Sequence, residues 1–220
     1  MTGVEEFADA AAVQFPGDAS QPTPPFTMGG PDAPVNIWQW KAVWQADIER
    51  GFDTTMTRYP NTYADFYPNG DDPLYKPALY VGNPLAQRDH DSPIESVIAG
   101  GFGTLTHADV QDVTGAGEWR DGRWRALFVR QFAPAAPGLA GFAEGETTNV
   151  AFAVWDGGSG DRNGQKSIAP FIELTIGGGE ASAVAADDGG AGWLIAIVLA
   201  IVAVAVGVYL YTVRQQSGAG

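Results

Sequence analysis

The sequence predicts an all-β domain, a β-sandwich with long loops, followed by one C-terminal transmembrane helix. Three observations support this prediction. Short runs that alternate apolar and polar residues recur along the first 176 residues, as in Val35–Lys41. The pair Asp121-Gly122 joins two such runs, which is a strong hairpin signal. Residues 191–213 carry no charged side chain, and a helix of that length spans about 34 Å, enough to cross a membrane.

The first 34 residues are poor in regular structure. Six prolines between Pro16 and Pro34 interrupt this segment, so only Phe7–Phe15 is expected to form a short helix or strand. Val35–Lys41 then reads as a strand with Trp38 and Trp40 on one side. These two tryptophans fit either a core strand or the aromatic wall of a ligand pocket.

The middle of the chain has few periodic segments. Trp44–Leu85 is rich in Gly, Pro, Asn, Asp and Tyr and is expected to form long loops. Ser92–Ala99 is expected to form a short helix, because Pro93 suits a first helical turn and Glu95 suits the N-terminal dipole.

The hairpin around Asp121-Gly122 is the clearest local structure. Trp124, Ala126 and Phe128 share one predicted face of its second strand, and arginines occupy much of the other face. A last strand is expected near Phe171–Ile176.

The segment from Asn149 to Ser167 begins as a strand and ends as a loop. Its apolar run reaches Trp155, breaks in a glycine-rich loop and delivers Lys166 just before the next apolar run. This arrangement fits a surface turn or a device that places one amine in a pocket. The oxygen-rich stretch Asp156–Asp161 lacks the order and the closing Glu of a calcium loop.

Composition excludes several classes of protein. The net charge is −14, with 17 Asp, 9 Glu and only three Lys, a balance typical of salt-loving organisms and unsuited to nucleic-acid binding. The chain has no cysteine and two histidines, which excludes thiolate-ligated metals and a three-histidine metal site. No carboxylate pair has the distinctive spacing of a glycosidase, and Gly101–Thr106 is not a phosphate loop.

The predicted organisation has four parts. Residues 1–176 form the β domain, 177–190 a Gly/Ala/acidic linker, 191–213 the transmembrane helix and 214–220 a short tail. Arg214 follows the span and two aspartates precede it, which predicts a cytoplasmic tail and an extracytoplasmic β domain. The first residues do not resemble a signal peptide.

Five blocks of sequence, in order, resemble one family. They are Val13–Pro16; Phe26–Gly29 with Pro34–Ala42; Gly101–Thr106; Gly117–Trp124 with Phe128–Arg130; and Val150–Gly157 with Asn163–Ser167. They resemble the haem b-binding γ subunits of ethylbenzene dehydrogenase, dimethylsulfide dehydrogenase, and selenate and chlorate reductases. That family has more sequence before the first block, so the sandwich is expected to be incomplete at its N-terminus.

The resemblance implies a site. In this family a β-sandwich holds one b haem between a methionine and a lysine, which correspond here to Met28 and Lys166. Trp38, Trp40 and Trp155 are the expected aromatic wall around the cofactor. A lysine amine ligates iron only when it is neutral, so burial must lower its pKa.

The resemblance also implies a function. The chain is expected to be a membrane-anchored b-type cytochrome subunit without substrate chemistry of its own. It would carry electrons between a molybdopterin- and iron–sulfur-containing oxidoreductase and the respiratory chain. Its partners would be a molybdopterin catalytic subunit, an iron–sulfur subunit and the membrane.

Two other interpretations stay open from the sequence. One is a membrane-tethered sandwich that binds carbohydrate or another surface, with Trp38, Trp40, Trp119 and Trp124 as stacking platforms. The other is a defunct fragment. A haem spectrum and the exposure of the tryptophans distinguish the first of these from a cytochrome.

Overall fold

The structure is a computed structural model that describes residues 7–177 apart from residues 21, 53–58, 62–76 and 88. The predicted span 191–213 and tail 214–220 lie outside the described residues, as does the predicted linker apart from residue 177. Among the described residues, no helix is both long and apolar enough to cross a bilayer.

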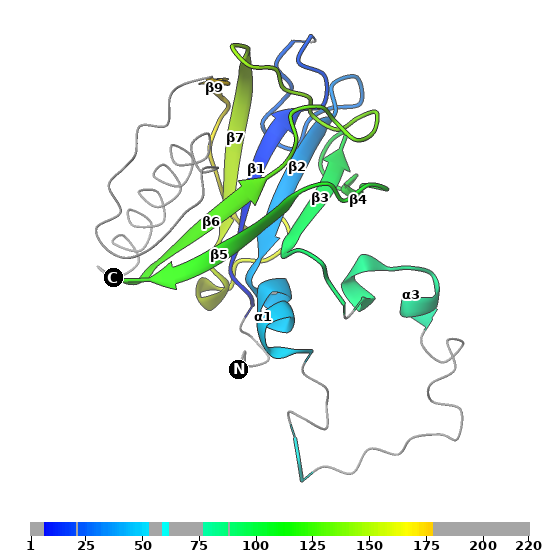
Figure 1. Cartoon of the computed structure of the whole chain (residues 1–220), viewed down its shortest axis with the longest axis vertical. Helices are drawn as coiled ribbons and strands as arrows, with labels where there is room; N and C mark the ends of the chain where they lie inside the picture. The colour runs from blue at the N-terminus through cyan, green and yellow to red at the C-terminus, as the bar shows by residue number, and fades with distance from the viewer. Residues whose placement is uncertain (1–6, 21, 53–58, 62–76, 88, 178–220) are drawn as a thin grey trace.

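One antiparallel sheet of seven strands forms the centre of the fold (Figure 1). Its strands are β1 (Ala10–Pro16), β2 (Val35–Lys41), β3 (Ile94–Ala99), β4 (Thr106–His107), β7 (Thr147–Trp155), β8 (Ser167–Ile168) and β9 (Ile172–Thr175). The strand order is β4-β3-β2-β1-β7-β8, and β9 also pairs with β7. Strand β1 pairs with β2, which follows it closely, and with β7, which lies near the other end of the described segment. The sheet therefore joins both ends of the described segment.

A hairpin forms a second layer on one face of this sheet. Strands β5 (Thr114–Arg120) and β6 (Arg123–Val129) pair with each other and cross in front of β1, β2 and β3 in Figure 1. Phe128 of the hairpin is buried in one core cluster with Val13 and Trp40 of the sheet. The Asp121-Gly122 turn and the inward face of β6 are as the sequence predicts.

The opposite face of the sheet carries a separate core cluster. Its buried members include Ala12, Val35, Ile37, Val97 and Trp155. Successive side chains of a strand point to opposite faces of the sheet, so consecutive residues of one strand belong to different clusters.

Two local predictions were wrong. Ser92–Ala99 is not a helix, because Ile94–Ala99 pairs in full antiparallel register with β2. The buried carboxylate of Glu95, which suggested a helix start, instead forms an ion pair with Lys41 of β2. Lys41 lies 54 residues before Glu95 in the sequence, so the residues around Glu95 carry no signal of this pairing.

A second difference lies in the predicted loop region. Its first part forms helix α1 (Ala42–Arg50), which buries Trp44. The short helix α3 (Pro77–Tyr80) and the 3-10 turns η2 (Pro84–Ala86) and η3 (Gly157–Ser159) are the remaining helical elements of the described residues. The prediction of a mostly-β domain is confirmed.

Candidate functional site

Met28 and Lys166 meet in the structure. The Lys166 Nζ donates a hydrogen bond to the Met28 Sδ over 3.7 Å, although 138 residues separate them in the sequence. Met28 lies in the loop between β1 and β2, and Lys166 lies just before β8. The fold therefore brings together the two side chains that the sequence analysis selected as metal ligands.

The Met28 loop holds its methionine in an uncommon backbone conformation. Met28 has φ +78°, which few non-glycine residues adopt. Its carbonyl accepts a hydrogen bond from the Gly101 N–H at 2.9 Å, and the Gly29 N–H donates to the Pro25 carbonyl at 2.9 Å. A Cβ on Gly29 would lie 2.8 Å from the Ala33 carbonyl oxygen, so only glycine fits there. The loop fixes the direction in which Met28 leaves the backbone.

The Lys166 loop is built from a set of local hydrogen bonds. The Asp156 side chain accepts from the backbone N–H of Ser159, and the Asp161 carboxylate accepts from the N–H of Asp156. Arg162 and Gln165 form a two-way backbone bridge just before the lysine. These two carboxylates accept hydrogen bonds from the loop backbone. Among the described residues, no group of three or more His, Cys, Asp or Glu side chains is placed to hold a metal ion.

The Lys166 amine lies in surroundings that favour its neutral form. Burial lowers the pKa of Lys166 from its ordinary value of 10.5. Within the described part of the chain no carboxylate forms an ion pair with it, and its Nζ lies 4.9 Å from the centre of the Trp155 ring. The Trp155 Nε1 in turn donates to the Asn163 carbonyl at 3.0 Å, which fixes the ring beside the lysine loop.

Met28 and Lys166 both line an apolar cavity of about 130 Å³. Its floor is formed by three small residues of the sheet, Ala12, Ala151 and Ala153, which are adjacent across β1 and β7. The cavity is also lined by Gln14, Phe26, Thr27, Ile37, Phe102, Phe152, Trp155, Gly164 and Ile168. Alanine is less common in strands than larger β-branched and aromatic residues, and the short side chains at these three positions leave the cavity open.

The predicted aromatic wall divides between the two faces of the sheet. Trp155 lines the cavity, whereas Trp38 and Trp40 do not and are buried in the cluster under the hairpin. The reason is strand alternation, since Ile37, the residue before Trp38 in β2, lines the cavity from the opposite face of the strand. Trp38 is 4% exposed and Trp40 1% exposed, so neither can serve as an open stacking platform for a sugar.

Sequence reasoning missed the alanine floor and the ring of Phe102. The floor has a sequence signal, because Ala10 and Ala12 in β1 and Ala151 and Ala153 in β7 recur at the two-residue spacing of one strand face. Phe102 has no such signal, because it lies in a loop and is 80% exposed.

Comparison with known proteins gives one family. The family model described as "Ethylbenzene dehydrogenase" matches residues 1–167, which is more than half of the chain. The ORF7 protein of Haloferax mediterranei, named as a respiratory nitrate reductase heme subunit, is 28% identical over 179 residues. That match covers 81% of this chain and 47% of the relative.

Two further relatives carry subunit names. The dimethylsulfide dehydrogenase subunit gamma of Rhodovulum sulfidophilum is 28% identical, over 75% of this chain and 46% of the relative. The chlorate reductase subunit gamma of Ideonella dechloratans is 24% identical, over 76% of this chain and 50% of the relative. The chain thus spans about half the length of these relatives. It belongs to the ethylbenzene dehydrogenase family.

Proposed function

We propose, from its membership of the ethylbenzene dehydrogenase family, that this chain is a haem b-binding electron-transfer subunit with Met28 and Lys166 as axial ligands. The observation that carries the proposal is the 3.7 Å contact between the Met28 Sδ and the Lys166 Nζ in an apolar cavity. One relative is named as a heme subunit, and two others are named as gamma subunits of oxidoreductases.

The donor chemistry fits a low-spin haem iron. A thioether is a soft ligand that raises the reduction potential, and an amine binds iron only after it has lost its proton. Burial of Lys166 lowers the pKa of its amine and so reduces the cost of that loss. When bound, the haem supplies a one-electron couple, and the chain's own residues supply the ligands, a dry wall and the orientation of the lysine.

The described residues provide one wall of such a site. The cavity volume of about 130 Å³ is below the roughly 300–1,000 Å³ of pockets that enclose a cofactor-sized molecule. The alanine floor of β1 and β7 offers a flat, apolar surface on which a planar group can lie. Met28 and Lys166 line the same cavity from two different loops.

The remaining parts of the proposal concern assembly. The chain would exchange electrons with a molybdopterin catalytic subunit through an iron–sulfur subunit, and with the respiratory chain. Residues 191–213 would anchor it in the cell membrane with the β domain outside and residues 214–220 in the cytoplasm. The oxidoreductase subunit names of the relatives support this assignment of partners.

Haem reconstitution tests the proposal. We expect the purified chain to bind haem b with the sharp α band of a six-coordinate, low-spin cytochrome when it is reduced. Met28→Leu and Lys166→Leu, which each replace a ligand by a side chain that cannot bind iron, should keep the fold and convert the spectrum to a five-coordinate or high-spin form. The measurement is the visible and near-infrared spectrum of the ferric and ferrous protein.

The chain offers matched controls for both changes. Met56→Leu and Lys76→Leu make the same substitutions at other positions and should leave the spectrum unchanged. A folded chain that takes up no haem would contradict the proposed function. A spectrum that responds to Met56→Leu instead of Met28→Leu would contradict the choice of ligand.

A further inference from the structure

A continuous series of contacts leads away from the Met28–Lys166 cavity to the other side of the sheet. It begins at Trp155, whose ring lies 4.9 Å from the Lys166 Nζ and whose side chain lines the cavity. Two residues after Trp155, the backbone N–H of Gly157 donates to the Asp9 Oδ1 at 2.8 Å. The first part of the path therefore runs through the strand end that carries the lysine loop.

Asp9 connects this strand end to the hairpin. Its second oxygen, Oδ2, accepts a hydrogen bond from the Trp124 Nε1 at 2.8 Å. Gly157 makes the approach possible, because a Cβ at that position would lie 1.8 Å from the Phe7 carbonyl oxygen. One carboxylate thus joins two backbone segments and an indole that lie far apart in the sequence.

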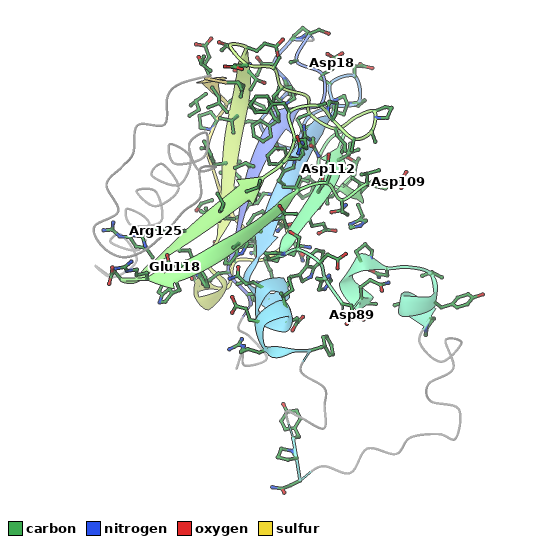
Figure 2. All side chains as sticks on the ribbon, in the orientation of Figure 1. Asp18, Asp89, Asp109, Asp112, Glu118 and Arg125 are labelled. Atoms are coloured by element: carbon green, nitrogen blue, oxygen red, sulfur yellow. The ribbon has the colours of Figure 1, made fainter. Side chains whose placement is uncertain are left out.

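The path ends at an exposed tryptophan. The Trp124 ring packs against Trp119 with centroids 5.3 Å apart and against Trp40 at 4.7 Å. Trp119 is 46% exposed, which is uncommon for so large an apolar ring. Figure 2 shows Glu118 and Arg125, the sequence neighbours of these two tryptophans, at the free end of the hairpin.

A small cavity of about 50 Å³ confirms that these parts converge. It is lined by Trp40, Trp119, Trp124 and Trp155 together with Asp9. Trp155 lines both this cavity and the one that Met28 and Lys166 face. Four of the chain's seven tryptophans therefore gather between the candidate haem site and one surface.

We propose that this path is the route by which single electrons cross between the candidate haem site and the surface, and that Trp119 marks where a one-electron carrier protein docks. The inference rests on the proposed function. One electron passes from the reduced carrier to ferric iron, or from ferrous iron to the oxidised carrier. No bond breaks and no proton moves.

The shape of the surface favours a protein carrier. Trp119 lies on a projecting hairpin and lines a cavity of only about 50 Å³, well below the roughly 300–1,000 Å³ of small-molecule pockets. Exposed tryptophan is enriched at the centre of protein interfaces, where it supplies much of the binding energy. The aromatic rings and hydrogen bonds act as the medium of transfer and need not be oxidised themselves.

The absence of cysteine makes a direct test possible. Arg125→Cys places one thiol at the hairpin end, where a ruthenium tris-bipyridine label can be attached. A flash of light then makes the excited Ru(II) label donate one electron to the ferric haem. The rate of haem reduction is read from its absorbance.

Variants along the path give the expected result. Trp124→Leu should slow the transfer by about tenfold, and Trp124→Phe, which keeps a ring but loses the N–H, by less. Trp44→Leu, a buried tryptophan elsewhere in the fold, is the matched control and should leave the rate unchanged. A Trp124→Leu protein that has a normal haem spectrum and an unchanged rate overturns the route.

A second measurement tests the docking surface with cytochrome c as the protein probe. Trp119→Ser should lower the second-order rate of electron exchange by about tenfold, the effect of losing an interface anchor. Tyr80→Ser removes another aromatic ring, 66% exposed, and should have no effect. Equal rates for the two variants overturn the docking assignment.

A third readout needs no haem. The indole N–H of Trp124 should be protected from hydrogen exchange in the haem-free protein, and Asp9→Ala should remove that protection. Rapid exchange in the unsubstituted protein would show that the Asp9 link is absent and would overturn the route. Failure to bind haem would instead contradict the proposed function itself, so the two failures are distinguishable.

Discussion

Burial of the Lys166 amine lowers the stability of the folded chain, yet it also favours the neutral amine that the proposed iron site requires. Its amine gives up water on folding and gains in return the Met28 sulfur and the Trp155 ring. Neither group carries a negative charge, so the pKa of Lys166 falls below its ordinary value through burial. The same burial would make the amine available in its neutral form for the proposed ligation of iron.

This cost predicts a pH dependence in the haem-free protein. Below the lowered pKa, both the folded and the unfolded chain carry the proton, and the folded state bears the full cost of burying the charge. Between the lowered pKa and 10.5 the unfolded chain binds more protons, so the free energy of unfolding from this residue rises with pH. Lys166→Met should remove that rise.

The same variant should stabilise the haem-free protein at neutral pH. We expect a gain of up to about 1 kcal/mol, because the partly exposed amine keeps some contact with water. Urea denaturation at several pH values measures both effects. A Lys166→Met protein that is less stable at neutral pH than the parent would contradict this account. Lys76→Met is the control.

At the scale of elements, the close packing of the hairpin on Trp40 depends on Gly117. The backbone of Gly117 in β5 lies directly over the Trp40 ring, and a Cβ there would come within 2.3 Å of the Trp40 Cζ2. Gly117→Ala should lower the free energy of unfolding by about 1–3 kcal/mol, as overpacking in a core does.

Gly100→Ala provides the comparison for this prediction. Its Cβ would meet only ordinary contacts, the nearest at 3.5 Å. We expect its stability to stay close to that of the parent or to rise slightly, because alanine restricts the unfolded chain. Chemical denaturation followed by tryptophan fluorescence measures both variants, and equal effects of the two would refute the close packing of β5 on Trp40.

The elements also show what local sequence can and cannot predict. Strand β2 and the β5–β6 hairpin were predictable because alternation and an Asp-Gly turn are local signals. Strand β3 was not, because Pro93 and Glu95 imitate a helix start, while the decisive partners are in β2. The site shows the same contrast. Resemblance to a family predicted Met28 and Lys166, whereas the alanines have a local two-residue spacing but come together only through the pairing of β1 with β7.

At the scale of the whole molecule, charge dominates. The net charge of −14 makes the folded chain repel itself at low ionic strength. Raising KCl to about 1 M, where the Debye length is about 3 Å, should therefore raise the midpoint of thermal unfolding. Replacement of the exposed Asp32, Asp91 and Asp109 by asparagine should weaken this dependence. A midpoint that is flat or falls over that range would contradict the prediction.

The two clusters on either side of the central sheet have a consequence for variation in this protein. In β1, Ala11, Val13 and Phe15 pack beneath the hairpin, whereas Ala12 and Gln14 reach the cavity. In a saturation mutagenesis of β1, substitutions at odd-numbered positions should therefore have different effects from substitutions at even-numbered positions. Substitutions at odd positions should change the packing beneath the hairpin, and substitutions at even positions should change the wall of the cavity and, with the proposed haem in place, its absorption spectrum and reduction potential. The two faces of this sheet therefore separate the packing of the hairpin from the lining of the cavity.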